Sequence, residues 1–352
     1  MAGTSFTPDH GNIVHILFGN ETSCELAVEF DNPARLRPRQ LNLTRHPETT
    51  NLTDHIIRVE GVDLIIRPHA CVYKGMLDFQ SSTRMVAVKH ITCRGDHRLA
   101  VRVRREIFIW MGLSHANIVE LLGTTNDPNY PSLGMVSDWM DNGNLGAFIV
   151  EGLALSHRLE ITCDVAAGLA YCTIIYLLDR LSTDLQTTVH SKDVIHGDLT
   201  SGNVLIDNTG RALLVDFGLS SITAAFEGTS FMASVIGGAL RFRALELMPP
   251  VDKDHNDFEP ELTTASDIYS LGSVILQTLS GQQPYYNIQD DFMVALVLAQ
   301  RRTPERPHSQ KLIGRDEYWR FIGQCWSKDT IKRPNAEAAH KELLRLREEV
   351  LR

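Results

Sequence analysis

Five polar side chains, widely separated along the sequence, are of types that handle phosphate, metal ions and protons. Lys89 ends the apolar run VAVK, and Glu106 follows on a stretch with helical spacing. Asp198 lies in the segment HGDLTSGN with Asn203 five residues later, and Asp216 opens the tripeptide DFG. Each residue alone is weak evidence, because a solvated lysine, a surface glutamate or a loop tripeptide would look the same. Together they combine a cation with the oxygen ligands that hard cations prefer and with carboxylates that can accept a proton.

Hydrophobic periodicity predicts a strand-rich region followed by a mainly helical one. From residue 56 the chain is rich in β-branched residues, and the runs CVYKGML and MVAVKHI are typical of short strands. Residues 97–113 carry apolar positions spaced mainly by three and four, which predicts one amphipathic helix. After Gly143 the pattern is mainly helical, apart from the strand-like runs NVLID and ALLVD around a turn at 208–210. The pattern therefore predicts a small β-rich lobe followed by a larger helical lobe.

The composition is that of a globular protein. The chain has 352 residues, of which 43 % are hydrophobic and 22 % charged, and its formal net charge is −9. This length fits about two domains, and an acidic chain lacks the basic footprint of a nucleic-acid binder. The chain has no run of 18 or more apolar residues, so the sequence predicts no membrane span. The six cysteines lack the spacing of zinc ligands. With no signal peptide visible, we expect a cytoplasmic location as the default and leave the nucleus open.

In this order, the five polar residues resemble the signature set of eukaryotic protein kinases. The resemblance covers about residues 53–345 and includes ALELM at 244–248, the apolar stretch at 266–285 and the pair CW…RP at 325–334. HGDLTSGNVLID and GGALRFRALEL are most similar to the tyrosine-kinase-like group, which mostly phosphorylates serine and threonine.

The resemblance implies an α+β, bilobal fold, with a small antiparallel β-rich N-lobe that carries one helix and a larger, mainly α-helical C-lobe. It divides the chain into a weakly structured extension at 1–52, an N-lobe at 53–138 and a C-lobe at 139–352.

The resemblance also implies an ATP- and Mg²⁺-dependent kinase that acts on serine or threonine of a protein substrate, with tyrosine left open. Lys89 would hold the α- and β-phosphates, Glu106 would orient Lys89, and Asp198 would accept the substrate hydroxyl proton. Asn203 and Asp216 would hold the metal ion. The alternative is a weak or inactive pseudokinase that works as a binding module. The residues expected around ATP are Ile65, Val72, Ala87, Lys89, Asp138, Met140, Asn203, Leu205 and Asp216.

The resemblance assigns supporting roles to further residues. The hinge between the lobes would be Val136–Met140, with the backbone of Asp138 and Met140 against adenine and the small Ser137 in front of an open, deeper pocket. The resemblance further implies that His196 and Phe217 pack beneath the site and that Asp267 anchors the catalytic loop. It also implies an ion pair between Glu246 and Arg333.

The glycine loop is the largest departure from the family pattern. Anchored on Val72, the three glycine positions of GxGxxGxV hold Ile65, Arg67 and Ala70. Glycine allows backbone N–H groups to approach phosphate without a Cβ in the way. Hydrogen bonds to charged groups contribute about 1.5–3 kcal/mol each, so the loss of two would weaken ATP binding by about a hundredfold.

Four further substitutions change residues around the catalytic loop. Gly197 replaces the arginine of HRD, and Leu245 replaces the proline of APE. Thr200 stands where serine/threonine kinases place a lysine near the γ-phosphate, and Ala239 stands where they place the threonine that contacts that lysine. Without the arginine, we expect that activation-loop phosphorylation does not switch activity through an Arg–phosphate pair. The candidate phosphosites are Ser220, Ser221, Thr223, Thr229, Ser230 and Ser234.

Residues 172–188 interrupt the family run just before the catalytic loop. Without them the chain reads GLAYVHSKDVIHGDL, which is a continuous kinase sequence. One interpretation is a continued helix, because apolar residues at 174–181 have helical spacing. The other, which we favour from the sequence, is a retained intron or a gene-model error.

Overall fold

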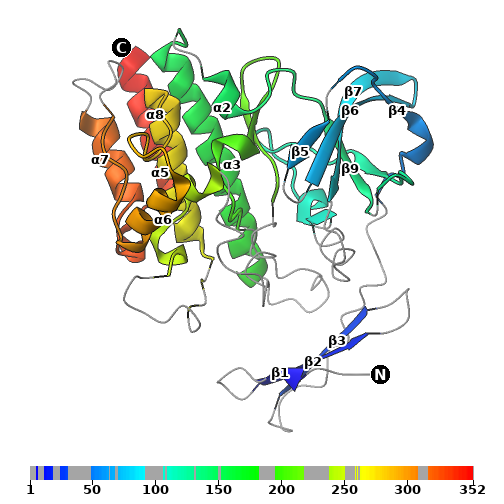
Figure 1. The fold of residues 1–352 in the computed structure, drawn as a ribbon, viewed down its shortest axis with the longest axis horizontal. Helices are drawn as coiled ribbons and strands as arrows, with labels where there is room; N and C mark the ends of the chain where they lie inside the picture. The colour runs from blue at the N-terminus through cyan, green and yellow to red at the C-terminus, as the bar shows by residue number, and fades with distance from the viewer. Residues whose placement is uncertain are drawn as a thin grey trace. The chain divides into compact units, whose positions relative to one another are not determined.

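The computed structural model divides the chain into two compact units, Met1–Thr50 and Asn51–Arg352, each described here by itself. Figure 1 shows the elements of both units along the chain. The residues that the structure describes are 5–6, 12–18, 24–30, 49–62, 64–67, 70–91, 106–107, 109–130, 132–149, 152–181, 195–217, 238–249, 258, 260, 262–307 and 316–351.

The first unit contains a three-stranded antiparallel sheet. Its strands are β1 (Ser5–Phe6), β2 (Asn12–Phe18) and β3 (Cys24–Phe30), in that order. β2 and β3 pair along their full length, from Asn12 opposite Phe30 to Phe18 opposite Cys24. The resemblance predicted a weakly structured extension at 1–52, and the described residues of this unit form three paired strands.

The second unit begins with a six-stranded antiparallel sheet. The strand order is β4-β6-β7-β9-β8, and β5 pairs with the first residues of β6. β6 and β7 form the longest pair, joined by a two-residue turn at Gln80 and Ser81, both of which have positive φ. The strands are β4 (Ile56–Arg58), β5 (Ile65–Arg67), β6 (Ala70–Phe79), β7 (Ser82–Ile91), β8 (Gly123–Thr125) and β9 (Gly134–Asp138).

The two faces of this sheet have different partners. Side chains alternate along a strand, so Lys89 shares a face with its cross-strand partners Val72 and Met135. The opposite face is closed by Leu52, whose side chain is 1 % exposed and packs in one cluster with Val88 and other apolar residues. The backbone N–H of Leu52 also donates to the carbonyl of Thr124 at 2.8 Å, which fixes this cover in place. The Lys89 face therefore stays directed toward the rest of the unit.

The helical part of this unit is built around α5 (Thr264–Ser280), most of whose residues are buried. α5 begins at a capping box between Thr263 and Ser266 and ends at Gly281, whose φ of 77° suits glycine. α3 (Leu155–Leu181) packs against α5 and α8 (Ala336–Leu351), and α5 packs against α7 (Asp316–Cys325) (Figure 1). The shorter elements are α2 (Leu145–Phe148), α6 (Asp291–Ala299) and the hairpin of β10 (Val204–Ile206) and β11 (Ala212–Leu214).

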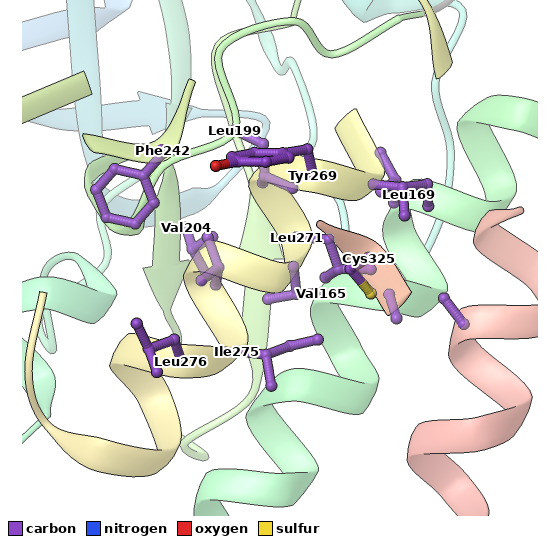
Figure 2. Packing of buried hydrophobic residues seen from close by; sticks show 14 of the residues in the cluster. Val165, Leu169, Leu199, Val204, Phe242, Tyr269, Leu271, Ile275, Leu276 and Cys325 are labelled. Atoms are coloured by element: carbon purple, nitrogen blue, oxygen red, sulfur yellow. The ribbon is translucent and has the colours of Figure 1, made fainter. Parts of the chain in front are cut away.

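The core of this part joins α5 to the strands that carry the catalytic loop. Figure 2 shows Leu271, Ile275 and Leu276 of α5 packed with Val165 and Leu169 of α3. Leu199 and Val204, which flank Asn203, belong to the same cluster and are almost completely buried. The catalytic loop is therefore seated on α5.

α3 extends through the first part of the unusual segment 172–188. The helix continues to Leu181, and Cys172 lies fully buried on it. Residues 172–181 are helical, as their spacing predicted, whereas residues 182–188 lie outside the described part. The interpretation of 172–188 as a retained intron or a gene-model error stays a prediction. Among the described helices, none combines the length and the apolar character needed to cross a bilayer.

Candidate active site

Lys89 contacts two acidic side chains from different parts of the chain. Its Nζ donates to Oε1 of Glu106 at 2.8 Å and to Oδ1 of Asp216 at 2.6 Å. Lys89 lies on β7, Glu106 lies on a helical turn, and Asp216 follows β11. Lys89 and Glu106 are 7 % and 1 % exposed. Burial alone lowers the pKa of Lys89, but the carboxylates of Asp216 and Glu106 outweigh it and raise the pKa above its ordinary value, so Lys89 is a fixed cation.

Asp198 and Asn203 form a second pair. Nδ2 of Asn203 donates to the backbone carbonyl of Asp198 at 2.8 Å and to its Oδ2 at 2.9 Å. This fixes the amide so that Oδ1 remains as its acceptor end. Burial raises the pKa of Asp198 to about 6, against the opposing effects of the Asn203 hydrogen bond and the Arg243 charge. Asp198 is therefore a partly buried carboxylate whose pKa lies well above that of an ordinary aspartate.

Backbone hydrogen bonds hold the two groups side by side. The N–H of Val215 donates to the carbonyl of Asn203 at 3.1 Å, so Asp216 follows directly after a residue bonded to Asn203. Asp216 has a φ of 69°, which costs free energy in a residue other than glycine. The Lys89 contact holds it there. The structure thus brings Lys89, Glu106, Asp198, Asn203 and Asp216 into one site.

Asp267 of α5 anchors the loop that carries Asp198. Its two carboxylate oxygens accept the N–H groups of His196 at 2.8 Å and of Gly197 at 2.7 Å. Gly197 has a φ of 69°, which glycine adopts without the strain a Cβ would bring. The rings of His196 and Phe217 lie 4.9 Å apart beneath the site. The supporting contacts that the resemblance implied are therefore present.

The residues expected on the nucleotide side are arranged around Lys89. Val72 is the cross-strand partner of both Lys89 and Ile65, and Ala87 is the partner of Ser137. These five residues therefore share the Lys89 face of the sheet. Met140 and Leu205 pack against the adjoining cluster around Met135. Asp138 ends β9 and forms an ion pair with Arg84 at 3.2 Å.

Lys74 contacts the segment after β9, and the sequence analysis did not identify this residue. Its Nζ donates to Oδ1 of Asp141 at 3.0 Å and lies 5.0 Å from the ring centroid of Trp139. The N–H of Trp139 also donates to the carbonyl of Met85 at 3.1 Å. The signal was available, because Lys74 alternates onto the same face as Val72 in a mainly apolar strand.

The ion pair between Glu246 and Arg333 was predicted and is confirmed. Arg333 donates through two nitrogens to the two carboxylate oxygens of Glu246 at 2.6 and 2.7 Å, and also to the carbonyl of Ala265 at 2.8 Å. This two-pronged pair joins the start of α5 to the segments before and after it. Leu245 at the former proline position leaves the pair intact.

The departures from the glycine pattern lie on the β5–β6 hairpin. Arg67 pairs with Ala70 and Ile65 with Val72, so backbone pairing is regular at the three glycine positions. Thr200 turns its hydroxyl back to accept the N–H of Gly202 at 3.2 Å, as a cap. The candidate phosphosites between residues 220 and 234 lie outside the described residues.

Comparison with known proteins decides the family. The family described as protein tyrosine and serine/threonine kinase matches residues 68–343. The chain belongs to this family of protein kinases. The bilobal α+β fold expected from the sequence is thereby confirmed.

Several curated kinases are similar to most of the chain. A probable serine/threonine-protein kinase of Dictyostelium discoideum is 28 % identical over 269 residues, 76 % of this chain and 47 % of that protein. Serine/threonine-protein kinase CTR1 of Arabidopsis thaliana is 28 % identical over 260 residues, 71 % of this chain and 27 % of CTR1. Calmodulin-binding receptor-like cytoplasmic kinase 3 of the same plant is 24 % identical over 340 residues, 91 % and 59 % of the two chains. This kinase chain thus spans well under two thirds of the length of these relatives.

Proposed function

We propose that this chain is an ATP- and Mg²⁺-dependent protein kinase that phosphorylates serine and threonine of protein substrates. The observation that carries the proposal is the meeting of Lys89, Glu106 and Asp216 with the Asp198–Asn203 pair in one site. Such a site positions a phosphoryl group and counters its charge, which is most of what phosphoryl transfer requires of a protein. The similarity to kinases named as serine/threonine-specific supports the choice of acceptor.

Each residue has a distinct task in the proposed reaction. Lys89 binds the α- and β-phosphates, and Glu106 keeps the ammonium pointed at them. The substrate hydroxyl oxygen bonds to the γ-phosphorus, and the bond from that phosphorus to the β,γ-bridging oxygen breaks with its electron pair leaving on ADP. Asp198 takes the hydroxyl proton. The raised pKa of this carboxylate, about 6, suits a group that must accept a proton near neutral pH.

A magnesium ion fits the oxygen donors of Asn203 and Asp216. Asn203 presents the oxygen end of its amide because both hydrogen bonds of Nδ2 go to Asp198, and Asp216 adds a carboxylate. The described residues contain no cluster of three acidic, histidine or cysteine ligands, so the ion would also rely on phosphate oxygens, as Mg²⁺ commonly does. Bound there, Mg²⁺ would neutralise phosphate charge.

The proposed nucleotide pocket uses the Lys89 face of the sheet. Ile65, Val72 and Ala87 would cover one side of the adenosine, and Leu205 the other. The backbone of Asp138 and Met140 would meet the adenine edge. Ile65 is 41 % exposed, so its side chain is accessible to a nucleotide.

The proposal also covers the kinase group to which the chain belongs and its location in the cell. HGDLTSGNVLID and GGALRFRALEL support membership of the tyrosine-kinase-like group. The similarity to a protein named as a receptor-like cytoplasmic kinase supports a cytoplasmic location.

Transfer of labelled γ-phosphate to a generic protein substrate, followed by phosphoamino-acid analysis, tests the proposal. We expect label on serine and threonine with Mg²⁺ present, and none with Asp198→Asn. Label on tyrosine alone would contradict the acceptor assignment. Binding of Mg²⁺-ATP without any transfer would favour the pseudokinase alternative.

A further inference from the structure

A pocket lies beside Asp198, and its lining residues come from outside the sheet that carries Lys89. Three elements form it: the catalytic loop, the segment that leads to η5 (Leu245–Leu247), and the start of α5. Its lining includes Asp198, Thr200, Ala239, Arg243, Ser266, Asp267 and Ser270. Because Asp198 would receive the proton of the acceptor hydroxyl, this pocket borders the place where the acceptor and the transferred group meet.

Arg243 is the one side chain with a positive charge among the described residues that line the pocket. Burial lowers the pKa of Arg243, and the nearby Asp198 carboxylate opposes that effect. A guanidinium nevertheless stays protonated in proteins. Arg243 therefore places a permanent cation next to Asp198.

The backbone on both sides of Arg243 is fixed. Phe242 and Ala244 are 5 % and 0 % exposed and belong to the main core, where Figure 2 shows Phe242. The N–H of Arg243 donates to the carbonyl of Leu240 at 3.1 Å, and the Glu246–Arg333 pair follows three residues later. The backbone that carries this cation is thus fixed before any substrate arrives, and a preorganised charge is effective in catalysis.

The charges already described in the site are unbalanced. Lys89 is shared between the carboxylates of Glu106 and Asp216, and Asp198 adds a third negative charge. A triphosphate brings further negative charge into the same space. Thr200 offers no cation, because its side chain is a hydroxyl that caps the turn at Gly202. A second cation near Asp198 reduces the repulsion between this carboxylate and the phosphoryl group that moves toward it.

We propose that Arg243 is a further catalytic cation of the site, one that contacts the transferred phosphoryl group on the acceptor side and counters the charge of Asp198. The inference rests on the proposed function and deepens it. It explains how a kinase site works with threonine at position 200, since the positive charge comes from another element of the chain.

The test compares Arg243→Met, Arg243→Lys and the double variant Arg243→Met/Thr200→Lys with the unaltered chain. Arg345→Met is the matched control, because Arg345 pairs only with glutamates of its own surface helix in the described contacts. The measurements are kcat, the KM for ATP and for the protein substrate, and the Kd of Mg²⁺-ATP relative to Mg²⁺-ADP by calorimetry. The thermal unfolding midpoint is followed in each variant.

We expect Arg243→Met to lower kcat by about thirtyfold or more, as loss of one fixed charge at a reacting centre does. The Kd ratio of ATP to ADP should rise about threefold, because only ATP carries the γ-phosphate. Arg243→Lys should retain most of the activity. Thr200→Lys should restore at least about a fifth of the lost kcat to the double variant, because it returns a cation to the same pocket.

Three results would overturn the inference. One is an unchanged kcat and Kd ratio in Arg243→Met. Another is an effect confined to the KM for the protein substrate, which would make Arg243 a reader of substrate sequence. The third is a loss that Thr200→Lys does not restore and that follows a lower unfolding midpoint, as for a structural brace. If the unaltered chain transfers no phosphate, the proposed function fails, and the Kd ratio alone decides on Arg243.

Discussion

Lys89 donates a 2.6 Å hydrogen bond to Asp216, and this bond joins the β-rich part of the kinase domain to its helical part. Asp216 is held in a left-handed backbone conformation that an aspartate adopts only at a cost. The same ammonium contacts Glu106 at 2.8 Å. The lysine therefore sets the position of the residue that we assign to the metal, and the catalytic groups are already assembled in the described conformation.

The rate of transfer should depend on the ionisation of Asp198. Burial raises the pKa of this carboxylate to about 6. Below that pH the group is protonated and cannot accept the hydroxyl proton, so kcat/KM should fall by about tenfold per pH unit as the pH drops below 6. The measurement is the pH profile of kcat/KM, with circular dichroism at each pH to show that the chain stays folded. A flat profile down to pH 5 in folded protein would contradict the assignment of the base.

Restoring the three glycines should tighten nucleotide binding. In the triple variant Ile65→Gly/Arg67→Gly/Ala70→Gly, backbone N–H groups can approach the phosphates, and Mg²⁺-ATP should bind about a hundredfold more tightly. Calorimetry measures the change. Ile57→Gly, at an exposed position of β4, is the control for a glycine that only loosens the sheet edge. Weaker binding by the triple variant would show that Arg67 contributes more than the lost N–H contacts.

Activation-loop phosphorylation should not control this kinase through the catalytic loop. Gly197 has no side chain with which to bind a phosphate, and its N–H is already taken by Asp267. Phosphatase treatment should therefore leave the transfer rate within about twofold, whereas an Arg–phosphate fork contributes several charge-assisted hydrogen bonds. Abolished activity, with rescue by restoring phosphate at one site between residues 220 and 234, would refute the prediction.

Removing Glu246 should lower the free energy of unfolding more than removing its partner Arg333. The side chain of Arg333 is 1 % exposed and that of Glu246 is 29 % exposed. Glu246→Ala leaves a buried guanidinium without its counter-ion and should lower the free energy of unfolding by about 3–5 kcal/mol. Arg333→Met leaves a carboxylate that water can reach and should cost less. Urea unfolding measures both.

Glu349→Ala, on the exposed face of α8, provides the comparison for this pair. It should cost no more than about 1 kcal/mol, the usual range of a surface ion pair. Equal losses from Glu246→Ala and Arg333→Met would contradict the asymmetry.

Much of the fold and site followed from the order of short motifs. Lys89, Glu106 and Asp216 are far apart in sequence, yet their types and order resemble the kinase signature set, and that resemblance predicted a shared site. The Glu246–Arg333 pair was predicted in the same way. The helical continuation to Leu181 followed from spacing, although the sequence alone did not favour it.

Other features depend on contacts that periodicity cannot show. Among the described residues, the strands at 12–18 and 24–30 pair with one another and with β1, and the sequence of this segment showed no clear period. Arg243 stood unremarked within GGALRFRALEL, because its significance comes from lining the same pocket as Asp198, which lies far away in the sequence. The sequence did hold one indication of its importance, which is that this charged residue stands between two core residues, Phe242 and Ala244.

A single-turnover experiment tests the central claim most directly, with the protein in excess over γ-labelled ATP in the presence of Mg²⁺ and a protein substrate. We predict that the unaltered chain moves the label to the substrate and that Asp198→Asn slows this step by at least about a hundredfold. Both forms should bind Mg²⁺-ATP with similar affinity, because Asp198 acts on the hydroxyl. Tight binding of Mg²⁺-ATP without movement of label by the unaltered chain, or equal rates in the two forms, would contradict the account.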